Sequence, residues 1–493
     1  MLKFSTSSYK TILYCAIFVR LIAVLFSPGY GMHDDHFLII EASASWVDGY
    51  DYNHWLPWTE GNTGMPEGHS FTYVGLNYLY FASMKLIGIV DPQILMLGNR
   101  FLHALASLVV VWYGMKITEK LSSKENAVKV GWILALLWIL PFVSVRNLVE
   151  VAALPFLVAG VWILLKNASL KNFLIGGLLI GMAVSFRYQI GVFAIGIAAY
   201  YFFKGQFKLC FTFSAGILIV FGITQGLVDY LIWGYPFAEL HSYVTYNMKE
   251  GTTYLPNQNY FMYFIVLTGS LFVPLGLVML VGFFKSYKQY AVLFIPTLVF
   301  ILFHTLYPNR QERFILSVLP FFIILGVIGF QLFKDSQFKA RLWKVSMIIF
   351  WVINIPFLFF ASTMYSKKSR VEAMSHLYNN QMENERILLE GSAANRVSMM
   401  PKFYAKSWYC TFVERTDTTM DLKVNPVMDY DYIFFFDEKD LTKRIQQYKQ
   451  LYPNMKLEKK SYPSSLDVLL RELNPRNANE YIEVWKTNFG KAN

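Results

Sequence analysis

Charged residues are scarce in this sequence, and cysteines are scarcer. Asp, Glu, Lys and Arg make up 16% of the 493 residues, whereas 55% of the residues are hydrophobic and 18% are aromatic. Soluble domains carry about 25% charged residues, so this composition excludes an ordinary soluble protein. The sequence is typical of a polytopic membrane protein.

The three cysteines, Cys15, Cys210 and Cys410, lie far apart. Their spacing fits neither a disulfide framework nor a zinc site. The net charge of +11 is spread over short loops between apolar runs, without the clustered basic stripe of a nucleic-acid-binding protein. No internal repeat is evident, which weakens the interpretation as an inverted-repeat transporter.

Apolar runs of about 17–25 residues predict membrane-spanning helices. The first run follows Lys3 and Lys10 as a signal peptide would, but its exit "FSPGYGM" is not a clear cleavage site, so we expect an uncleaved span. The predicted spans lie near 11–28, 98–116, 130–146, 148–165, 172–187, 189–203, 209–233, 259–284, 289–307, 313–333 and 345–363. This pattern predicts an all-α membrane domain with about eleven transmembrane helices.

One further apolar run, at 73–90, decides the orientation of every later span. If this run does not cross, the lysine-rich loops all lie on the cytoplasmic side, as the positive-inside rule requires. The opposite face then keeps only scattered basic residues, among them Lys85, Arg100, Arg187, Arg310 and Arg313. If this run crosses the membrane, the lysine-rich loops after it move to the outside and the scattered arginines face the cytoplasm. We therefore expect 73–90 to lie along the outer leaflet, with twelve spans and a weak charge bias as the alternative.

This topology places four polar segments on the non-cytoplasmic face, at 31–70, 233–258, 306–314 and in the whole tail after residue 365. The tail is rich in charge and contains a strand-like "DYIFFF" and a helical "LTKRIQQYKQLY". We predict a transmembrane domain at 1–364, whose first outer loop (29–97) carries juxtamembrane helices. A small, outward-facing, soluble α/β domain is predicted at 365–493.

Two adjacent carboxylates, Asp34 and Asp35 in "GMHDDHFL", directly follow the first span. Ionisable groups at the bilayer edge are costly and are candidates for function. A helix through 34–41 would place Asp34 and Glu41 on one face and Asp35 off it. One carboxylate would then point into a cavity while a neighbour holds the other; His33 and His36 flank the pair. The structural alternative is a solvated loop end capped by Asp.

The segment "NRQERF" at 309–314 carries Arg310 and Arg313, which one helical turn would align. Arginine forks bind phosphate oxygens in a bidentate fashion, so a lipid phosphate or diphosphate is one suitable partner. The other possible partner of these arginines is Glu312, which would form a purely structural ion pair with them. Arg187 and Arg100 lie on the same predicted face and would complete a phosphate pocket, although each alone is more often a snorkelling anchor.

A carboxylate facing an arginine cluster suggests transfer of a group from a lipid-linked phosphate to an acceptor hydroxyl. The carboxylate would take the hydroxyl proton as general base, and the cations would stabilise the charge that develops on the leaving phosphate. Trp and Tyr are frequent in the outer loops. They suit stacking on sugar rings, although aromatic belts at membrane interfaces are the ordinary reason for such residues.

Five segments together resemble glycosyltransferase family 22, the GT-C fold mannosyltransferases that build GPI anchors and lipid-linked oligosaccharides, with their bacterial relatives. The segments are "MHDDHFLIIE" after the first span, "RNLVEVAALPF" at 146–156, "GMAVSFRYQIG" at 181–191, "VDYLIWGYPFAELHSYVTYN" at 228–247 and "HTLYPNRQERFILSVLP" at 304–320. The family's first-loop signature is similar to His-Pro-Asp-Glu, on whose acids Asp34 and Asp35 fall. Its late signature, His-Lys-Glu-any-Arg-Phe, falls on residues 309–314.

The sequence departs from these signatures at several positions. Met32 and His33 replace the His-Pro, Leu38 replaces a later Gln, Asn309 replaces the late His and Gln311 replaces the late Glu. Positive charge is kept at Arg310 and Arg313, so the phosphate-binding role survives. Because the other signature positions have changed, the donor sugar can differ from mannose.

The resemblance implies an inverting transfer of a mannose-like sugar from a polyprenyl (dolichyl-type) phosphate donor to a hydroxyl of a glycan or lipid-linked acceptor, without a cofactor or an obligatory metal. It implies a first-loop Asp as general base, and the alignment favours Asp34. The implied catalytic residues are Asp34 and Asp35, the donor-phosphate ligands are Arg310, Arg313, Arg187 and Arg100, and the other substrate contacts are His36, Glu41, Asn309, Gln311, Glu150 and Arg146. The GT-C fold also lays first-loop helices on the membrane.

Two other classes of function stay open. A polytopic lipid or sugar transporter would carry charges near span midpoints, where Arg20 is the main candidate. A polymerase or ligase acting on diphosphate-linked oligosaccharide would use the same arginines with a larger acceptor cleft. We predict an active site on the non-cytoplasmic face. The loosened signatures and the lack of an obvious ER retention signal at "FGKAN" favour a bacterial inner membrane over the ER membrane.

Overall fold

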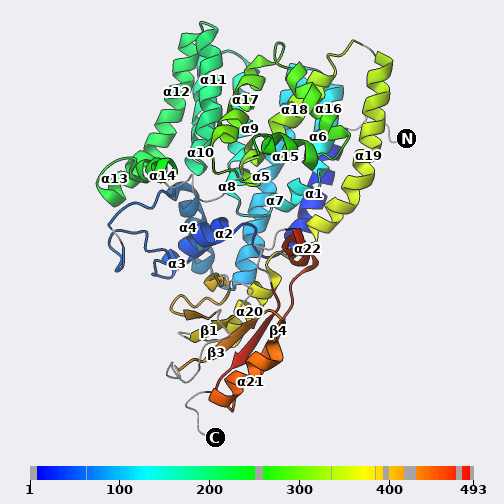
Figure 1. The fold of residues 1–493 in the computed structure, drawn as a ribbon. Helices are drawn as coiled ribbons and strands as arrows, with labels where there is room; N and C mark the ends of the chain where they lie inside the picture. Colours follow the sequence, from blue (N-terminus) through cyan, green and yellow to red (C-terminus); the bar gives the residue numbers. More distant parts are fainter. Residues whose placement is uncertain are drawn as a thin grey trace. The chain divides into compact units, whose positions relative to one another are not determined.

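The computed structural model describes residues 8–62, 64–249, 259–334, 336–382, 385–391, 399–415, 429–473 and 480–488. The chain divides into two compact units (Figure 1). The helical unit comprises Met1–Leu25, His54–Leu76 and Gly98–Thr363, and the mixed unit comprises Phe26–Asn53, Asn77–Leu97 and Met364–Asn493. The domain border expected at 364/365 stays a prediction, because the mixed unit also takes up parts of the first loop.

The helical unit is built from apolar helices and short connections. Its elements are α1 (Tyr9–Phe26), the start of α4 (Phe71–Leu86), most of α5 (Pro92–Leu121), α6 (Lys124–Leu136), α7 (Ile139–Val143), α8 (Val149–Ala152), α9 (Leu154–Lys166), α10 (Leu170–Phe186), α11 (Ile190–Phe203), α12 (Phe207–Phe221), η3 (Gly222–Leu227), α13 (Val228–Trp233), α14 (Ala238–Lys249), α15 (Met262–Ser270), α16 (Leu275–Lys285), α17 (Ala291–Leu306), η4 (Glu312–Val318), α18 (Leu319–Phe330) and α19 (Ser336–Ser362). Ser123 and Ser169 cap α6 and α10, because their side chains accept the backbone N–H groups of Asn126 and Asn172.

Within the described residues, six helices are long and apolar enough to cross a membrane: Tyr9–Phe26, Pro92–Leu121, Val149–Lys166, Phe207–Trp233, Glu312–Phe330 and Gln337–Ser362. Four shorter apolar helices accompany them, at Leu170–Phe186, Ile190–Phe203, Leu275–Lys285 and Ala291–Leu306. The helical, multi-pass character is confirmed by length and composition, but the expected number of eleven spans is not confirmed. One physical reason is that the run at 130–146 breaks between α6 and α7, at Leu137 and Trp138.

Close helix contacts in this unit depend on glycine. A Cβ atom at Gly282 of α16 would lie 2.0 Å from the carbonyl oxygen of Gly326 in α18, and one at Gly329 would lie 1.9 Å from the carbonyl oxygen of Gly282. Small residues let two helix backbones approach in this way, which is a common packing mode in membrane proteins. Every residue of α18 is buried, and the helix also contacts α6, α17 and η4.

The guanidinium group of Arg20 joins three helices. Its Nε donates to Oγ of Ser107 at 2.7 Å, its Nη1 donates to the carbonyl oxygen of Ala135 at 3.1 Å, and its Nη2 donates to that of Leu134 at 3.5 Å. The residue is only 2% exposed. Arg20 therefore links α1 to α5 and α6 through hydrogen bonds that its buried charge requires.

The mixed unit contains a five-stranded sheet in the order β2-β1-β3-β5-β4. The strands are β1 (Arg386–Glu390), β2 (Thr411–Arg415), β3 (Tyr432–Phe436), β4 (Lys456–Ser461) and β5 (Ile482–Lys486). β1 runs parallel to β2 and β3, whereas β5 runs antiparallel to β3 and β4. The strand expected in "DYIFFF" is β3, so the small α/β character predicted for the tail is confirmed.

The other elements of the mixed unit are α2 (His33–Asp35), η2 (His36–Glu41), α3 (Ala42–Val47), the remainder of α4, the first turns of α5, α20 (Lys368–Asn379), η5 (Lys402–Tyr404), α21 (Leu441–Leu451) and α22 (Ser465–Leu473). The predicted helix in "LTKRIQQYKQLY" is α21, whose Tyr448 packs against Leu388, Ile433 and Phe435 of the sheet. Arg444 of the same helix donates to Oε2 of Glu390 at 2.6 Å, so a buried ion pair anchors α21 to β1.

Candidate active site

The chain leaves α1 through a short bridge to a distant segment. Gly29 pairs with Ser366, whose backbone N–H donates to the carbonyl oxygen of Pro28 at 3.0 Å. A Cβ atom at Gly29 would lie 1.8 Å from the carbonyl oxygen of Ser366, and its φ of +83° suits glycine alone. The bridge fixes the start of the segment that carries the two aspartates.

Asp34 and Asp35 lie in α2, directly before the π-helix η2. The Asp34 side chain is exposed, whereas Asp35 is only 4% exposed. The expectation that Asp34 and Glu41 share one helical face is wrong, because Glu41 is fully buried. The reason is local: hydrogen bonds in a π-helix run from i to i+5, which changes the angular spacing that an α-helix would give.

The π-helix brings together His36 and Glu41, which are five residues apart. Nε2 of His36 lies 3.1 Å from Oε1 of Glu41, and both side chains are fully buried. Glu41 accepts the backbone N–H of Phe403 with both carboxylate oxygens, each at 3.0 Å, while His36 stacks on Tyr30 with ring centroids 4.2 Å apart. The pair connects the first loop to η5 inside the mixed unit, and substrate contact by either residue stays a prediction.

The helical unit gathers a second predicted group around one carboxylate. Oε1 of Glu150 lies 3.0 Å from Nη2 of Arg187 and 3.8 Å from Nε of Arg313. These residues come from α8, the turn between α10 and α11, and η4. Glu150 is 1% exposed, whereas Glu312, considered above as the partner of the arginines, is exposed. The structure therefore assigns the buried carboxylate to Glu150.

The two arginines of "NRQERF" do not share a helical turn, because η4 begins only at Glu312. Arg310 precedes it: its Nε donates to the carbonyl oxygen of Thr305 at 2.8 Å, and its guanidinium carbon lies 4.5 Å from the ring centroid of Tyr260. Arg310 and Arg313 are 6% and 8% exposed. Both are held close to protein partners.

Two predicted substrate contacts support Arg313. Oε1 of Gln311 accepts a hydrogen bond from Nε of Arg313 at 2.9 Å, and Nε2 of Gln311 donates to Oδ1 of Asn309 at 3.5 Å. This chain orients the guanidinium fork. The replacement of the family's Glu by Gln at this position therefore leaves the orienting acceptor in place and removes its negative charge.

The remaining predicted arginines lie in other surroundings. Nε of Arg100, in α5, donates to the carbonyl oxygen of Val24 in the last turn of α1 at 2.9 Å. Arg146 is 2% exposed, with its guanidinium carbon 4.4 Å from the ring centroid of Phe142. Phosphate binding by Arg100 and substrate binding by Arg146 stay predictions.

A buried hydrogen-bonded chain beside Arg146 is not predicted by the sequence. Nδ2 of Asn147 donates to Oη of Tyr73 at 3.2 Å, and Oη of Tyr73 contacts Nε2 of His103. Nδ1 of His103 lies 2.8 Å from the carbonyl oxygen of Asn99, so it carries the proton and leaves Nε2 to accept from Tyr73. The motif at 146–156 pointed to this region, but its partners come from α4 and α5.

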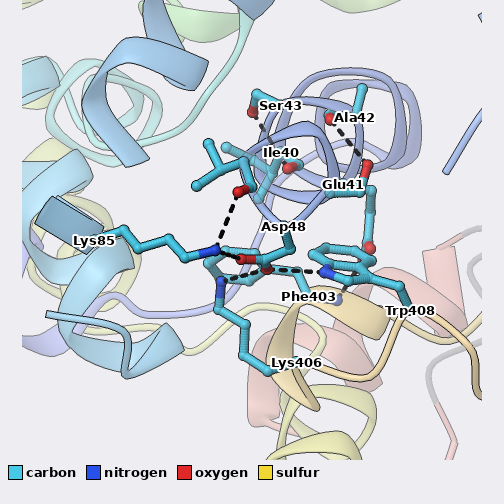
Figure 2. Close-up of polar contacts among 11 residues, drawn as sticks. Ile40, Glu41, Ala42, Ser43, Asp48, Lys85, Phe403, Lys406 and Trp408 are labelled. Atoms are coloured by element: carbon cyan, nitrogen blue, oxygen red, sulfur yellow. Dashed lines mark hydrogen bonds and ion pairs between the residues drawn. The ribbon is translucent and has the colours of Figure 1, made fainter. Parts of the chain in front are cut away.

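A second polar group that the sequence did not predict lies in the mixed unit (Figure 2). Oδ1 of Asp48 lies 2.7 Å from Nζ of Lys85, and Oδ2 accepts the Nε1–H of Trp408 at 2.9 Å. Nζ of Lys406 lies 3.5 Å from the same Oδ2. The only local signal was that Lys85 is the single basic residue in the apolar run at 73–90.

The charges in this cluster influence one another. Burial alone would raise the pKa of Asp48, but Lys406, Lys85 and the indole of Trp408 together bring it below its ordinary value. Burial lowers the pKa of Lys406, and the neighbouring Asp48 acts against that effect. We refer to Asp48, Lys85, Lys406 and Trp408 as the Asp48 cluster.

Among the residues that the structure describes, no three or more His, Cys, Asp or Glu side chains lie together in a way that could hold a metal ion. The polar clusters described above consist of carboxylates, arginines, lysines and neutral hydrogen-bonding groups. This set can bind a phosphate and move a proton.

An apolar multi-helix protein with a buried arginine–carboxylate cluster and a small C-terminal sheet fits the membrane glycosyltransferases of the GT-C class. The sequence profile of the Alg9-like mannosyltransferase family (glycosyltransferase 22) matches residues 11–410. The chain belongs to this family and is a glycosyltransferase. The resemblance drawn from the five sequence segments is thus confirmed.

Solved structures of the same fold agree with this assignment. ArnT from Cupriavidus metallidurans in the apo state is 10% identical, with a TM-score of 0.62 and 97% of each chain covered. ArnT from the same organism bound to undecaprenyl phosphate is 11% identical, with a TM-score of 0.61 and 97% of each chain covered. The oligosaccharyltransferase of Archaeoglobus fulgidus gives 12% and 0.54, covering 89% of this chain and 69% of that one. These likenesses show the fold alone, and a comparison with curated proteins finds no match.

Proposed function

We propose that this glycosyltransferase moves a mannose-like sugar from a polyprenyl (dolichyl-type) phosphate to a hydroxyl group of a glycan or lipid-linked acceptor, with inversion at the anomeric carbon. Membership of the Alg9-like mannosyltransferase family supports the sugar and the reaction class. A polyprenyl phosphate donor is supported by ArnT, which has the same fold and binds undecaprenyl phosphate. We place the active site on the non-cytoplasmic face, in a bacterial inner membrane.

The observation that carries the proposal is the cluster of Glu150, Arg187 and Arg313. Two guanidinium groups share one buried carboxylate, so the group as a whole is positively charged. A phosphate monoester or diester supplies the opposite charge and fits the fork of an oriented arginine. Gln311 holds Arg313 in a defined orientation, which is what stabilisation of a leaving phosphate requires.

We assign the general base to Asp34. The structure separates the two aspartates in a way that the sequence alone does not, because Asp34 is exposed and Asp35 is buried. A base must reach the acceptor hydroxyl directly or through one water molecule. Asp35 is better placed to support the local fold of α2.

The transfer balances without an added cofactor. The acceptor O–H gives its proton to the Asp34 carboxylate while its oxygen bonds to the anomeric carbon of the donor sugar. The bond from that carbon to the phosphate oxygen breaks, and the polyprenyl phosphate leaves with the electron pair. Arg187 and Arg313, with Arg310, stabilise the charge on the departing phosphate.

The two alternative functions meet different difficulties. A transporter needs its intramembrane charge on the transport path, but the guanidinium of Arg20 is occupied by Ser107, Ala135 and Leu134. A polymerase or ligase shares the fold, as the similarity to an oligosaccharyltransferase illustrates. Only the donor separates that class from ours, so the donor must be tested directly.

The test measures transfer of radiolabelled sugar from polyprenyl-phosphate mannose, and from its glucose analogue, to lipid and glycan acceptors in membranes. Wild type is compared with Asp34→Asn and Asp35→Asn at equal expression. Loss of a general base costs about 10²- to 10⁴-fold, so Asp34→Asn should lose transfer while keeping donor binding. Asp35→Asn should lose less per folded molecule. Full transfer in both variants would refute the base assignment, and no transfer from either donor by wild type would refute the donor class.

A further inference from the structure

A cavity of about 240 Å³ lies beside the Asp48 cluster, entirely within the mixed unit. Asp48 and Asp34 lie at opposite ends of the helical stretch formed by α2, η2 and α3. Among the described residues, the lining of the cavity includes no residue of α2 or η2. The cavity is therefore distinct from the proposed base.

The polar wall of the cavity carries more positive than negative charge. Lys85 and Lys406 both point toward the single carboxylate of Asp48 (Figure 2). The nearby carboxylate of Asp91 is used differently, because its Oδ1 accepts the backbone N–H groups of Gln93 and Ile94 at the start of α5. Among the charged residues that line the cavity, two ammonium groups face the one carboxylate of Asp48. The carboxylate of Glu41 also acts on Lys406, but it is held by His36 and by the backbone N–H of Phe403.

Lys406 is the better placed of the two ammonium groups to meet a ligand. Among the described residues its only hydrogen-bond acceptor is Oδ2 of Asp48, at 3.5 Å, although an ammonium group has three donors. Its side chain is 17% exposed, and its backbone φ is +54°. Non-glycine residues rarely adopt this conformation, and such outliers point to a functional constraint. The turn thus holds a largely buried ammonium group at the cavity.

The opposite wall is apolar and adjoins a membrane-spanning helix. It is formed by Phe81 of α4, Ile89 and Val90 of the following turn, and Leu95 of α5. α5 has 30 residues, or about 45 Å at 1.5 Å per residue, which matches a bilayer of about 40–45 Å including its headgroups. Its first turn, which holds Leu95, therefore lies at headgroup depth.

The turn that leads into α5 exposes apolar side chains beside these cations. Leu86 is 88% exposed, Ile87 is 67% exposed and Val90 is 48% exposed. Contiguous exposed apolar residues next to a candidate span are suited to contact with lipid chains. Basic residues close to such a surface are suited to anionic headgroups.

We propose that this cavity binds the phosphate headgroup of an anionic membrane phospholipid. Lys85 and Lys406 contact the phosphate, and the lipid's acyl chains extend along Leu86, Ile87 and Val90. The volume of about 240 Å³ suits a headgroup, since sites for whole small molecules occupy about 300–1,000 Å³. This proposal is independent of the transferase reaction, because it involves none of the residues assigned to it.

The competing interpretation is a closed structural contact that holds α3, α4 and the 406–408 segment together. A one-to-one pair of this structural kind is seen in the same unit between Lys460 and Glu483. Here one carboxylate serves two lysines and borders a cavity rather than packed side chains. An ammonium group that uses one of its three donors beside a cavity favours a ligand over a purely structural contact.

The test uses the full chain, purified in detergent and freed of lipid, and measures bound lipid by native mass spectrometry. Phosphatidylglycerol and phosphatidylcholine with the same acyl chains are titrated into wild type and into the Lys85→Gln/Lys406→Gln double variant. Wild type should prefer phosphatidylglycerol. Loss of two charge-assisted contacts should weaken phosphatidylglycerol binding about tenfold or more in the double variant and leave phosphatidylcholine binding unchanged.

Lys460→Gln is the matched control, because the two lysine side chains are similarly exposed and each is paired with a carboxylate. Lys460 is 48% exposed and lies 3.2 Å from Glu483, and Lys85 is 49% exposed and lies 2.7 Å from Asp48. The control should bind phosphatidylglycerol as wild type does. If the double variant fails to fold, Lys85→Glu alone must show the loss, because a half-exposed lysine tolerates reversal. Equal binding of both lipids by wild type, unchanged phosphatidylglycerol binding in the variants, or an equal loss in the control would overturn the proposal. Competition by polyprenyl phosphate at equal affinity would overturn it too, by showing a donor site.

Discussion

Oε1 of Glu150 lies 3.0 Å from Nη2 of Arg187 inside the helical unit, and Glu150 is 1% exposed. The same oxygen lies 3.8 Å from Nε of Arg313. Removing one partner of a buried ion pair leaves the other charge without compensation. Glu150 therefore both stabilises the arginines and limits the positive charge that they offer to a phosphate.

Glu150→Gln should lower the free energy of unfolding by about 3–5 kcal/mol, because Arg187 and Arg313 lose their shared buried carboxylate. Thermal unfolding in detergent measures this loss. Glu119→Gln is the control, since Glu119 also lies 3.0 Å from its partner, Lys116, but is about one-third exposed. The control should lose less than about 1 kcal/mol. Equal losses in the two variants would mean that burial does not distinguish the Glu150 cluster.

Glu41→Ala should loosen the attachment of the first loop to η5 within the mixed unit. The substitution removes the acceptor of the buried Phe403 N–H and the partner of His36. An unsatisfied buried donor costs about 1–3 kcal/mol. Hydrogen exchange should therefore accelerate at the Phe403 amide. Glu458→Ala removes a more exposed partner, 3.0 Å from His376, and should leave this exchange unchanged. Equal acceleration in both variants would contradict the assignment.

Arg20→Lys distinguishes the structural role of this residue from a role in transport. Lysine keeps the charge but cannot reach Ser107, Ala135 and Leu134 together, so the melting temperature should fall. Loss of two or three hydrogen bonds to a charged group amounts to a few kcal/mol. Sugar transfer per folded molecule should stay at the wild-type level. A variant with normal stability and abolished function would instead support the transporter.

The candidate site shows what sequence reasoning could predict and what it could not. The order of the blocks that contain Asp34, Glu150, Arg187 and Arg313 is enough to recognise the family, because each block keeps a few charged positions. The partner of the arginines was not predictable. Glu312 is next to Arg313 along the chain, but the packing of α8 against η4 brings Glu150 to within 3.8 Å of Arg313 instead.

Two further features of the structure were not predicted from the sequence, one with a local cause and one with a distant cause. The change from an α-helical to a π-helical register at His36–Glu41 is visible only in the hydrogen bonds of the folded chain, yet it decides which carboxylates are buried. The contact between Asp48 and Lys406 joins residues separated by 358 positions. The residue pattern within either segment does not predict such a distant partner. Long-range pairing therefore accounts for the polar clusters that were missed.

Glu239, in α14, is a buried carboxylate whose ionisation should affect stability near neutral pH. Its Oε2 accepts the backbone N–H groups of Gly68 at 2.7 Å and His69 at 2.9 Å, and its Oε1 accepts the Nε1–H of Trp233 at 2.8 Å. Burial raises the pKa of Glu239 to about 7; these backbone hydrogen bonds oppose the rise, and the charge of Asp229 adds to it. The folded state thus holds this proton more tightly than the unfolded state does.

The sign of the effect follows from linkage. A carboxyl group whose pKa is raised in the folded state stabilises that state most at a pH below its ordinary pKa of 4.5. This contribution is lost as the pH rises through about 7. Glu239→Gln keeps an oxygen acceptor and cannot ionise. The melting temperature of wild type relative to this variant should therefore fall between pH 5 and pH 8, measured in one detergent at constant ionic strength. For Glu125→Gln the difference from wild type should stay constant over this range, because Lys129 holds the pKa of Glu125 below its ordinary value. Parallel curves for wild type and Glu239→Gln would show that Glu239 does not titrate there.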